Sequence, residues 1–132
     1  MIVVDASVFA FALLDEGPMG DRCRAALAAD SRWVAPEHWT VEVLSVIRGS
    51  LLGGKISKDH AEDAVDALAR LEPAVPLSRV LLPRIWQLRG NLTAYDAAYV
   101  AAAEAYGCAL VTADGRLARA SGIRCPVDVI GG

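Results

Sequence analysis

The sequence predicts one α/β domain built on a mostly parallel sheet of about four to five strands, with helices on both faces. Three observations predict this class. The chain has 132 residues, which is the size of one compact domain. It is 55% hydrophobic with a mean hydropathy of +0.36, so it has enough apolar side chains for a sizeable core. Strand-like runs alternate with helical segments, as in parallel sheets covered on both sides. We therefore expect residues 1–132 to form a single domain.

The first half of the chain is predicted to contain two strands and four helices. The run at 2–4 is short and apolar, and Ser7 is suited to cap a helix that follows it. Pro36 suits the first turn of a later helix, and Ser57 suits the cap of the next. The expected strands are 2–4 and 32–35, and the expected helices are 8–14, 20–30, 36–52 and one running from Ser57 past Leu68.

The second half is predicted to contain three strands and three shorter helices. Pro76 favours an edge position for its strand, and one helix is expected to follow Pro83. Thr93 suits the cap of a helix that Gly107 ends. The expected strands are 74–77, 109–112 and 127–129, and the expected helices are 83–88, 94–106 and a short turn over 115–120.

Charge and hydropathy exclude several classes. The formal net charge of −3 and a pI near 5.3 argue against a protein that coats nucleic acids generally. No run reaches the roughly 18 apolar residues of a membrane span, and no basic segment precedes Asp5 as in a signal peptide. We expect a cytoplasmic protein without a membrane partner. Its three cysteines form no CxxC pair and are expected to be reduced.

Two aspartates directly follow strand-like runs. Asp5 follows the run at 2–4, and Asp114 follows the run at 109–112. In open parallel sheets the ligand crevice lies at the carboxyl ends of the strands, so both side chains would point there. Each could instead cap the helix after it, and the two together favour a site.

Two further acidic residues lie on predicted helices. Glu42 interrupts an apolar stretch and shares a narrow helical strip with His38 and Ser45, so a solvated glutamate is the alternative interpretation. Asp96 is the third residue of the helix that Thr93 begins, where it can complete a capping box. A residue at that position can also face a crevice.

A denser acidic group lies elsewhere and is not expected to carry chemistry. Its four members repeat at helical spacing opposite the apolar face of their helix, which is typical of a solvated surface. They are Asp59, Glu62, Asp63 and Asp66.

Four carboxylates from separate elements can converge only in three dimensions. If Asp5, Glu42, Asp96 and Asp114 do so, their repulsion requires a cation, and an all-oxygen set suits Mg²⁺ or Mn²⁺ rather than zinc. Such a site activates water and holds a phosphodiester. The hydroxyls of Ser7 and Thr112 stand two residues from Asp5 and Asp114, where they could orient these carboxylates or only cap a helix and end a strand.

Other chemistries find less support. His38 and His60 have no HExxH motif or triad partner and are expected at the surface. The glycine pair at 53–54 ends a helix, so it is no phosphate loop. Phosphotransfer domains on similar sheets need an aspartate at the position of Ser7.

Four motifs together resemble the PIN domain, and more narrowly the stand-alone VapC-type toxins of bacterial type II toxin–antitoxin modules. They are IVVDAS around Asp5, VEVLSVIR around Glu42, LTAYDAAYV around Asp96 and LVTADGRL around Asp114. The resemblance covers essentially the whole chain in order, and the block around Asp96 is its most specific part. Many relatives carry an asparagine three residues after the glutamate, where this chain has Ser45.

The resemblance implies a metal-dependent endoribonuclease that uses Mg²⁺ or Mn²⁺. Its acidic quartet would be Asp5, Glu42, Asp96 and Asp114, with Asp5 and Asp96 nearest the metal. It further implies an RNA substrate, a homodimer, and a VapB-type antitoxin whose tail covers the site. The alternative hypothesis is a catalytically idle PIN-like module for RNA binding or assembly.

Aromatic and basic residues give two further expectations. The chain has more large aromatic side chains than helices with one buried face need, which suits either an interface or the core. They are Trp33, Trp39, Trp86, Phe9 and Phe11. Without the four proposed ligands the charge is 13 − 12 = +1, so the acidic pI does not exclude RNA. The arginines that could flank the crevice are Arg79, Arg84, Arg89, Arg116 and Arg119.

Overall fold

A four-stranded, fully parallel sheet forms the centre of the molecule. The computed structural model describes residues 1–131, and in them the strands follow the order β2-β1-β3-β4. The strands are β1 (Ile2–Val4), β2 (Trp33–Val34), β3 (Ala109–Thr112) and β4 (Val127–Val129). The strand expected at 74–77 is reduced to a single bridge from Ala74 to Val34, beside β2. The predicted α/β class is confirmed.

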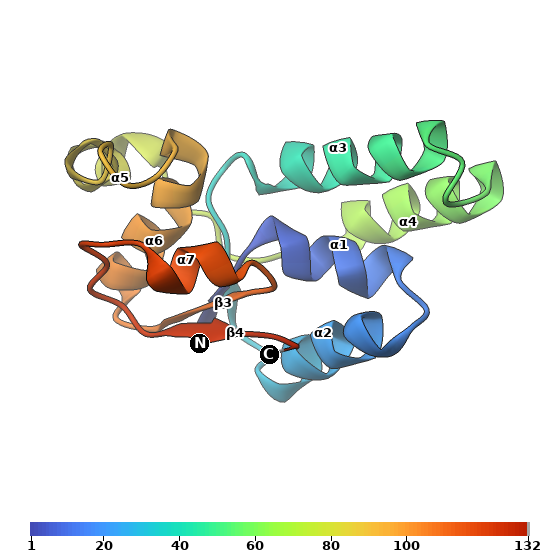
Figure 1. Ribbon diagram of the computed structural model, residues 1–132, viewed down its shortest axis with the longest axis horizontal. Helices are drawn as coiled ribbons and strands as arrows, with labels where there is room; N and C mark the ends of the chain where they lie inside the picture. Colours follow the sequence, from blue (N-terminus) through green and yellow to red (C-terminus); the bar gives the residue numbers. More distant parts are fainter. Residues whose placement is uncertain (132) are drawn as a thin grey trace.

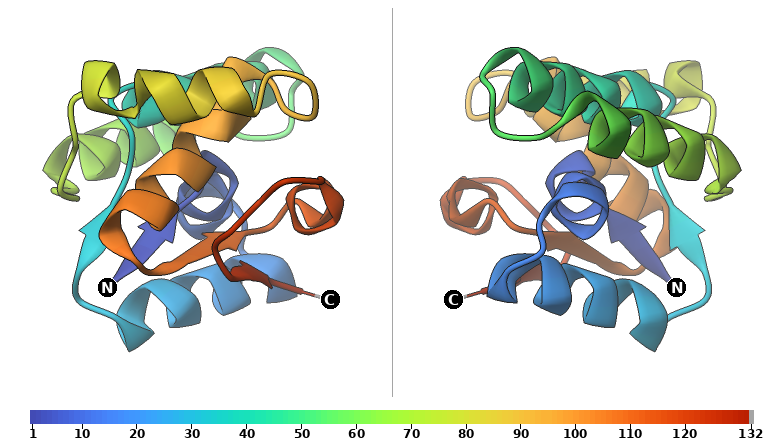
Figure 2. Two further views of the ribbon diagram at one scale, coloured as in Figure 1. Left: turned by 90° about the vertical axis from the view of Figure 1, so that its left-hand side faces the viewer. Right: turned by 90° about the vertical axis from the view of Figure 1, so that its right-hand side faces the viewer.

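Helices cover both faces of this sheet. They are α1 (Ala6–Leu14), α2 (Pro18–Ala29), α3 (Trp39–Leu52), α4 (Lys58–Arg70), α5 (Ser78–Gln87), α6 (Ala94–Tyr106) and α7 (Gly115–Arg119). Helices α1 and α6 contact the strands directly, and α3, α4 and α5 lie beyond them on the same side. Helix α2 lies on the opposite side of the strands (Figure 1, Figure 2).

Two predicted helix caps are confirmed and one is wrong. Ser57 Oγ accepts from His60 N at 3.0 Å, and Thr93 Oγ1 accepts from Asp96 N at 3.2 Å. Ser7, by contrast, lies inside α1, which begins at Ala6 after Asp5. The helix begins earlier than expected because the chain turns directly at the end of β1, and this frees the Ser7 hydroxyl for another partner.

Two helix starts that were predicted from prolines are wrong. Helix α3 begins at Trp39, so Pro36 precedes the helix rather than occupying its first turn. Helix α5 begins at Ser78 and includes Pro83, which was expected to precede the helix. Proline is unfavourable inside a helix because it has no N–H to donate and its ring crowds the carbonyl four residues before it, so tertiary packing rather than proline selects where α5 begins.

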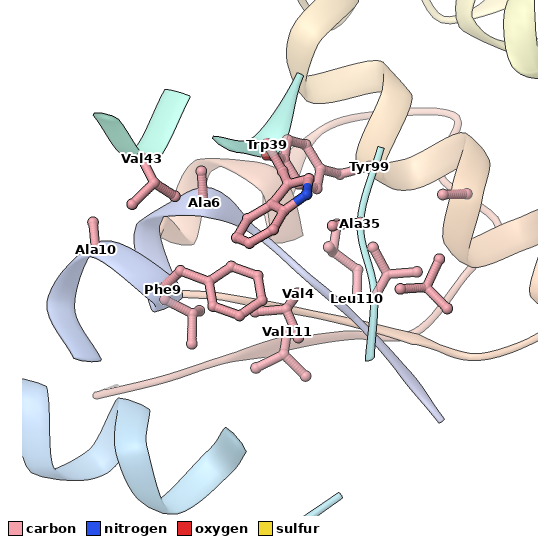
Figure 3. Packing of buried hydrophobic residues seen from close by; sticks show 14 of the residues in the cluster. Val4, Ala6, Phe9, Ala10, Ala35, Trp39, Val43, Tyr99, Leu110 and Val111 are labelled. Atoms are coloured by element: carbon pink, nitrogen blue, oxygen red, sulfur yellow. The ribbon is translucent and has the colours of Figure 1, made fainter. Parts of the chain in front are cut away.

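The core is built around aromatic residues of α1, α3 and α6. Phe9 is fully buried, with its ring centroid 4.8 Å from that of Trp39 and 5.9 Å from that of Trp33. Tyr99 enters the same buried cluster from α6 (Figure 3). Trp86 is 67% exposed, so the aromatic surplus is divided between core and surface.

The topology brings the ends of β1 and β3 together. Val4 pairs with Val111 in parallel register, so the residues that follow both strands lie at the same edge of the sheet. Asp5 follows Val4 directly, and Asp114 follows the end of β3 by two residues. Within residues 1–131 no helix is long and apolar enough to cross a membrane.

Candidate active site

Asp5 is the most buried carboxylate of this edge, with 7% of its surface exposed. Its Oδ2 accepts from Ser7 Oγ at 2.8 Å and from Thr112 Oγ1 at 2.7 Å. Its other carboxylate oxygen, Oδ1, has no hydrogen-bond partner within residues 1–131. One oxygen is therefore fixed by two neutral hydroxyls, and the other remains available to a ligand.

The same two hydroxyls connect Asp5 to the segment that carries Asp114. Thr112 Oγ1 accepts from Asp114 N at 3.0 Å, and Ser7 Oγ accepts from Ala113 N at 3.1 Å. Asp5 N donates to Val111 O at 3.0 Å. These bonds fasten the start of α1 to the end of β3, so Ser7 and Thr112 orient the acidic edge as well as hold it together.

Glu42 comes from α3 and is also held by one oxygen. Tyr99 Oη donates to Glu42 Oε1 at 2.8 Å, and His38 Nε2 lies 2.9 Å from the same atom without the alignment of a hydrogen bond. The His38 ring lies edge-on to Tyr95 and Tyr99, and its side chain is only 24% exposed. The expectation of a surface His38 is wrong, because the two tyrosines of α6 enclose the ring.

Asp96 lines two separate hollows in the surface. The first, of about 430 Å³, is lined by Glu42, His38, Tyr95 and Asp96 among others. The second, of about 310 Å³, is lined by Asp96 together with Arg116 and Arg119 of α7. The Asp96 carboxylate has no hydrogen bond or ion pair within the described chain, although its backbone amide is capped by Thr93. Only half of the predicted capping box therefore forms.

Asp114 differs from the other three acidic residues. Its Oδ1 accepts from Arg116 N at 3.0 Å, so it caps α7, as one of the two interpretations expected. The Arg116 guanidinium also contacts both of its oxygens, with Nη2 at 2.5 Å from Oδ2. Since the Arg116 side chain is 76% exposed, this pair lies at the open rim of the site.

Burial and like charges act on the two innermost carboxylates. Burial raises the pKa of Asp5 above its usual range, and the charges of Glu42 and Asp96 raise it further against the lowering effect of the two hydroxyls. Burial also raises the pKa of Asp96; Arg116 opposes this shift, while Asp114 and Glu42 add to it. Hydrogen bonds from Arg116 lower the pKa of Asp114. The four predicted carboxylates therefore lie within electrostatic reach of one another.

The arrangement is open rather than a closed metal cage. In the part of the chain that the structure describes, no three His, Cys, Asp or Glu side chains come close enough to enclose a cation by themselves. One buried and one half-buried carboxylate, Asp5 and Asp96, have raised pKa values and available oxygens, and they still fit a hard divalent cation. Mg²⁺ in particular takes one or two protein carboxylates and completes its shell with water and phosphate.

The five candidate arginines lie in different environments, and Arg79 is exposed on α5. Arg116 and Arg119 line the hollow beside Asp96. Arg84 instead pairs with Glu104, with Nε 2.6 Å from Oε1, and Arg89 stacks on the Trp86 ring at 4.5 Å. The expectation that Arg84 flanks the crevice is wrong, because Glu104 lies two turns along α6 from Asp96.

Tyr99 was not expected beside Glu42, whereas the helical strip shared by Glu42 and His38 already indicated that pair. In the sequence, Tyr99 is one more apolar residue of an alanine-rich buried helix. The one available signal is spacing: Tyr99 stands three residues after Asp96, on the same face of α6.

Comparison with known sequences identifies a family. The model of the PIN domain family matches residues 2–123 of the chain. A VapC ribonuclease of Mycobacterium bovis is 39% identical over 130 residues, covering 98% of each sequence. Ribonuclease VapC1 of Mycobacterium tuberculosis is 39% identical over 129 residues, covering 97% of this chain and 96% of the relative.

Solved structures with the same fold include two at low sequence identity. The VapC20 crystal structure of Mycobacterium tuberculosis, described as a sarcin-ricin loop cleaving toxin, has a TM-score of 0.67 at 17% identity and covers 94% of this chain and 97% of its own. FitAcB of Neisseria gonorrhoeae has a TM-score of 0.63 at 17% identity and covers 97% and 96%.

Proposed function

The chain belongs to the PIN domain family, and on that premise we propose that it is a metal-dependent endoribonuclease, the toxin of a VapBC-type type II toxin–antitoxin module. One observation carries the proposal. Asp5, Glu42 and Asp96 share one edge of the sheet, and within residues 1–131 neither Asp5 nor Asp96 is paired with a cation. The identity of 39% to VapC ribonucleases over nearly the whole chain supports cleavage of RNA.

A divalent metal ion is the proposed cofactor. Asp5 and Asp96 are the proposed ligands, with Glu42 and Asp114 as further candidates. Hard carboxylate oxygens suit Mg²⁺ or Mn²⁺, and both ions accept a site with few protein ligands. When bound, such an ion activates water and neutralises the charge of a phosphodiester during its hydrolysis.

The chain's own residues prepare this chemistry. Ser7 and Thr112 hold Asp5 Oδ2, so the carboxylate is already oriented before a ligand arrives. The cap from Thr93 fixes the first turn of α6 and with it the position of Asp96. Arg116 and Arg119 stand beside Asp96 in a hollow at the rim, where they can hold phosphates of the RNA on either side of the cleaved bond.

Protein partners are the second part of the proposal. A hollow of about 410 Å³ lined by Phe11, Leu14, Val46 and Ile56 begins at Ser7, beside Asp5. We propose that the tail of a VapB-type antitoxin occupies it and covers the acidic edge. The exposed apolar side chains of α5, among them Val80 and Trp86, support a homodimer. A toxin that acts on the RNA of its own cell is expected to work in the cytoplasm.

The decisive experiment is RNA cleavage by the purified chain. A structured RNA that contains a stem-loop is incubated with Mn²⁺ or Mg²⁺, with EDTA, and with the Asp96→Asn variant. We expect cleavage only by the wild-type protein with metal. The matched control is Asp63→Asn, which changes an exposed residue of the acidic group on α4 and should cleave like the wild type.

Two results would contradict this proposal. Cleavage that survives both EDTA and Asp96→Asn would exclude the carboxylate centre. Calorimetry that detects no divalent binding, combined with tight RNA binding and no cleavage, would instead favour the alternative of an idle RNA-binding module.

A further inference from the structure

We propose that Tyr99 is a positioning residue of this centre, whose buried hydroxyl fixes one oxygen of Glu42 and so aims the other at the metal. The inference rests on the proposed function and deepens it. Through this contact the carboxylate that α3 supplies acquires a defined place in the site.

The contact joins two helices that are remote in sequence. Tyr99 Oη donates to Glu42 Oε1 at 2.8 Å, across 57 residues of chain. Tyr99 stands three residues after Asp96 on α6, so one helix face supplies a proposed metal ligand and the group that holds a second. The positions of Asp96 and Glu42 are thereby linked through a single rigid helix.

The tyrosine hydroxyl is not required for packing. The Tyr99 ring is 0% exposed and belongs to the buried cluster with Ala6 and Trp39, where a phenylalanine ring would fill the same space (Figure 3). A hydroxyl in such a place costs free energy unless it is hydrogen-bonded. Its partner here is a carboxylate, and charge-assisted bonds of this kind are short and directional.

The hydroxyl also remains a donor at every relevant pH. Burial, followed by the neighbouring charge of Glu42, raises the pKa of Tyr99 far above its usual value, and the Ala6 backbone amide opposes this shift only in part. The proton therefore stays on Tyr99, which donates it to Glu42 Oε1.

His38 lies beside the same oxygen of Glu42. Its Nε2 lies 2.9 Å from Glu42 Oε1, so both contacts fall on one oxygen and, within residues 1–131, none falls on Oε2. The His38 ring is itself edge-on to the Tyr99 ring at 5.3 Å. Glu42 thus resembles Asp5 in that a hydroxyl holds one carboxylate oxygen while the second has no hydrogen-bond partner within residues 1–131.

The test is Tyr99→Phe, which removes the hydroxyl and keeps the ring. Changes in the groups that orient metal ligands typically cost about 10- to 100-fold in metal affinity or activity. We expect calorimetry to detect Mn²⁺ affinity lowered by about tenfold, and kcat for RNA to fall by a similar factor with KM within about twofold. The melting curve checks that the variant folds. Tyr106→Phe, on the exposed last turn of α6, is the matched control.

A double-mutant cycle identifies the route. If Tyr99 acts through Glu42, then Tyr99→Phe should cause almost no further loss of Mn²⁺ affinity in a Glu42→Gln background. Wild-type Mn²⁺ affinity and kcat in Tyr99→Phe, or losses that multiply in the double variant, would overturn this inference alone. A wild-type protein that neither binds Mn²⁺ nor cleaves RNA would overturn the proposed function, and the inference with it.

Discussion

The two ends of helix α6 treat a partly buried carboxylate in opposite ways. Asp96 in the first turn has a raised pKa and no cation bound to it within the described residues, whereas Glu104 in the last turn has a lowered pKa. Burial raises the pKa of Glu104 as well, but hydrogen bonds from Arg84 and the Arg124 amide outweigh that effect. The difference is a cation supplied by the chain itself.

At the Glu104 end the polar groups satisfy one another. Arg84 Nε and Nη2 lie 2.6 and 3.1 Å from the two carboxylate oxygens, and Nη2 also donates to Gly122 O at 2.6 Å. The Arg124 amide donates to Glu104 Oε2 at 2.8 Å. This cluster fastens α5 and the segment before β4 to α6. At Glu104 the chain supplies the counter-ion and the pair stabilises the fold, whereas the Asp96 carboxylate, unpaired with any cation within residues 1–131, stays available to the proposed ligand.

The largest effect is expected from Asp5→Asn. A bound metal contributes several kcal/mol of transition-state stabilisation, so its loss should reduce RNA cleavage by about 1000-fold. The same change should raise the melting temperature of the metal-free protein, because asparagine still accepts from Ser7 and Thr112 and removes a buried charge. A cleavage assay and calorimetry in EDTA measure the two results. A metal-free variant less stable than the wild type would contradict the comparison.

The next largest effect is expected from Glu104→Gln, and on stability alone. It leaves the Arg84 guanidinium, only 19% exposed, without a countercharge, which should cost about 2 kcal/mol of unfolding free energy. Denaturant unfolding measures this loss, and cleavage per folded molecule should be unchanged. Glu62→Gln in the exposed Lys58–Glu62 pair is the matched control and should change stability by less than about 0.5 kcal/mol. Reduced cleavage at temperatures where Glu104→Gln is folded would contradict the separation of the two ends.

The acidic edge could be predicted from the sequence, but its supports could not. Asp5 and Asp114 follow strands, so parallel topology alone brings them to one edge. The bond from Tyr99 to Glu42 spans 57 residues, and the pair of Arg84 with Glu104 spans 20. Such partners depend on how α3, α5 and α6 pack, and periodicity reports only which face of a helix is buried.

The predicted cap at Thr93 is confirmed and the one at Ser7 is wrong for a related reason. Thr93 caps α6 because the residues near it in sequence provide both donor and acceptor. Ser7 had an equally good local pattern, yet its hydroxyl bonds to Asp5 and Ala113, and the second of these is 106 residues away. The Ser7 hydroxyl is engaged by a neighbouring carboxylate and by a tertiary partner, and the local capping pattern reports neither of them.

The stability contributed by the acidic edge and the stability contributed by Glu104 are expected to change with pH in opposite directions. The folded pKa values of Asp5 and Asp96 are raised above the usual Asp value of 3.8, so the stability from their protonated forms is lost as the pH rises through those values. The folded pKa of Glu104 is below its usual 4.5, so its stabilisation is present at neutral pH and lost in acid.

Metal should therefore stabilise the protein more at pH 7.5 than at pH 4.5. At a Mn²⁺ concentration about tenfold above its Kd, the gain should be about 1.4 kcal/mol at the higher pH. Thermal melting with and without Mn²⁺ across this range measures it. Glu104→Gln should keep the Mn²⁺-dependent gain and Asp5→Asn should lose it; an equal gain at both pH values would contradict the assignment of Asp5 and Asp96 as the titrating ligands.

The smallest effect is expected on RNA binding, when the arginines beside Asp96 are replaced. The arginines near the two ends of α6 have different partners. Arg116 and Arg119 line the hollow beside Asp96, while Arg84 is engaged with Glu104. Replacing Arg116 and Arg119 by alanine together should weaken RNA binding several-fold. It should also reduce the slope of log affinity against log salt by about one unit for each arginine that pairs with an RNA phosphate. Binding is measured in the Asp5→Asn background, where the RNA stays intact.

The control for that measurement is Arg70→Ala, at the exposed end of α4. It removes the same charge from the molecule as either α7 substitution, so any general effect of net charge on RNA association would appear there as well. Only direct pairing with RNA phosphates makes the α7 variants change the salt slope while Arg70→Ala does not. Equal slopes in all these variants would exclude Arg116 and Arg119 and would direct the search for the RNA path to the hollow between Glu42 and Asp96.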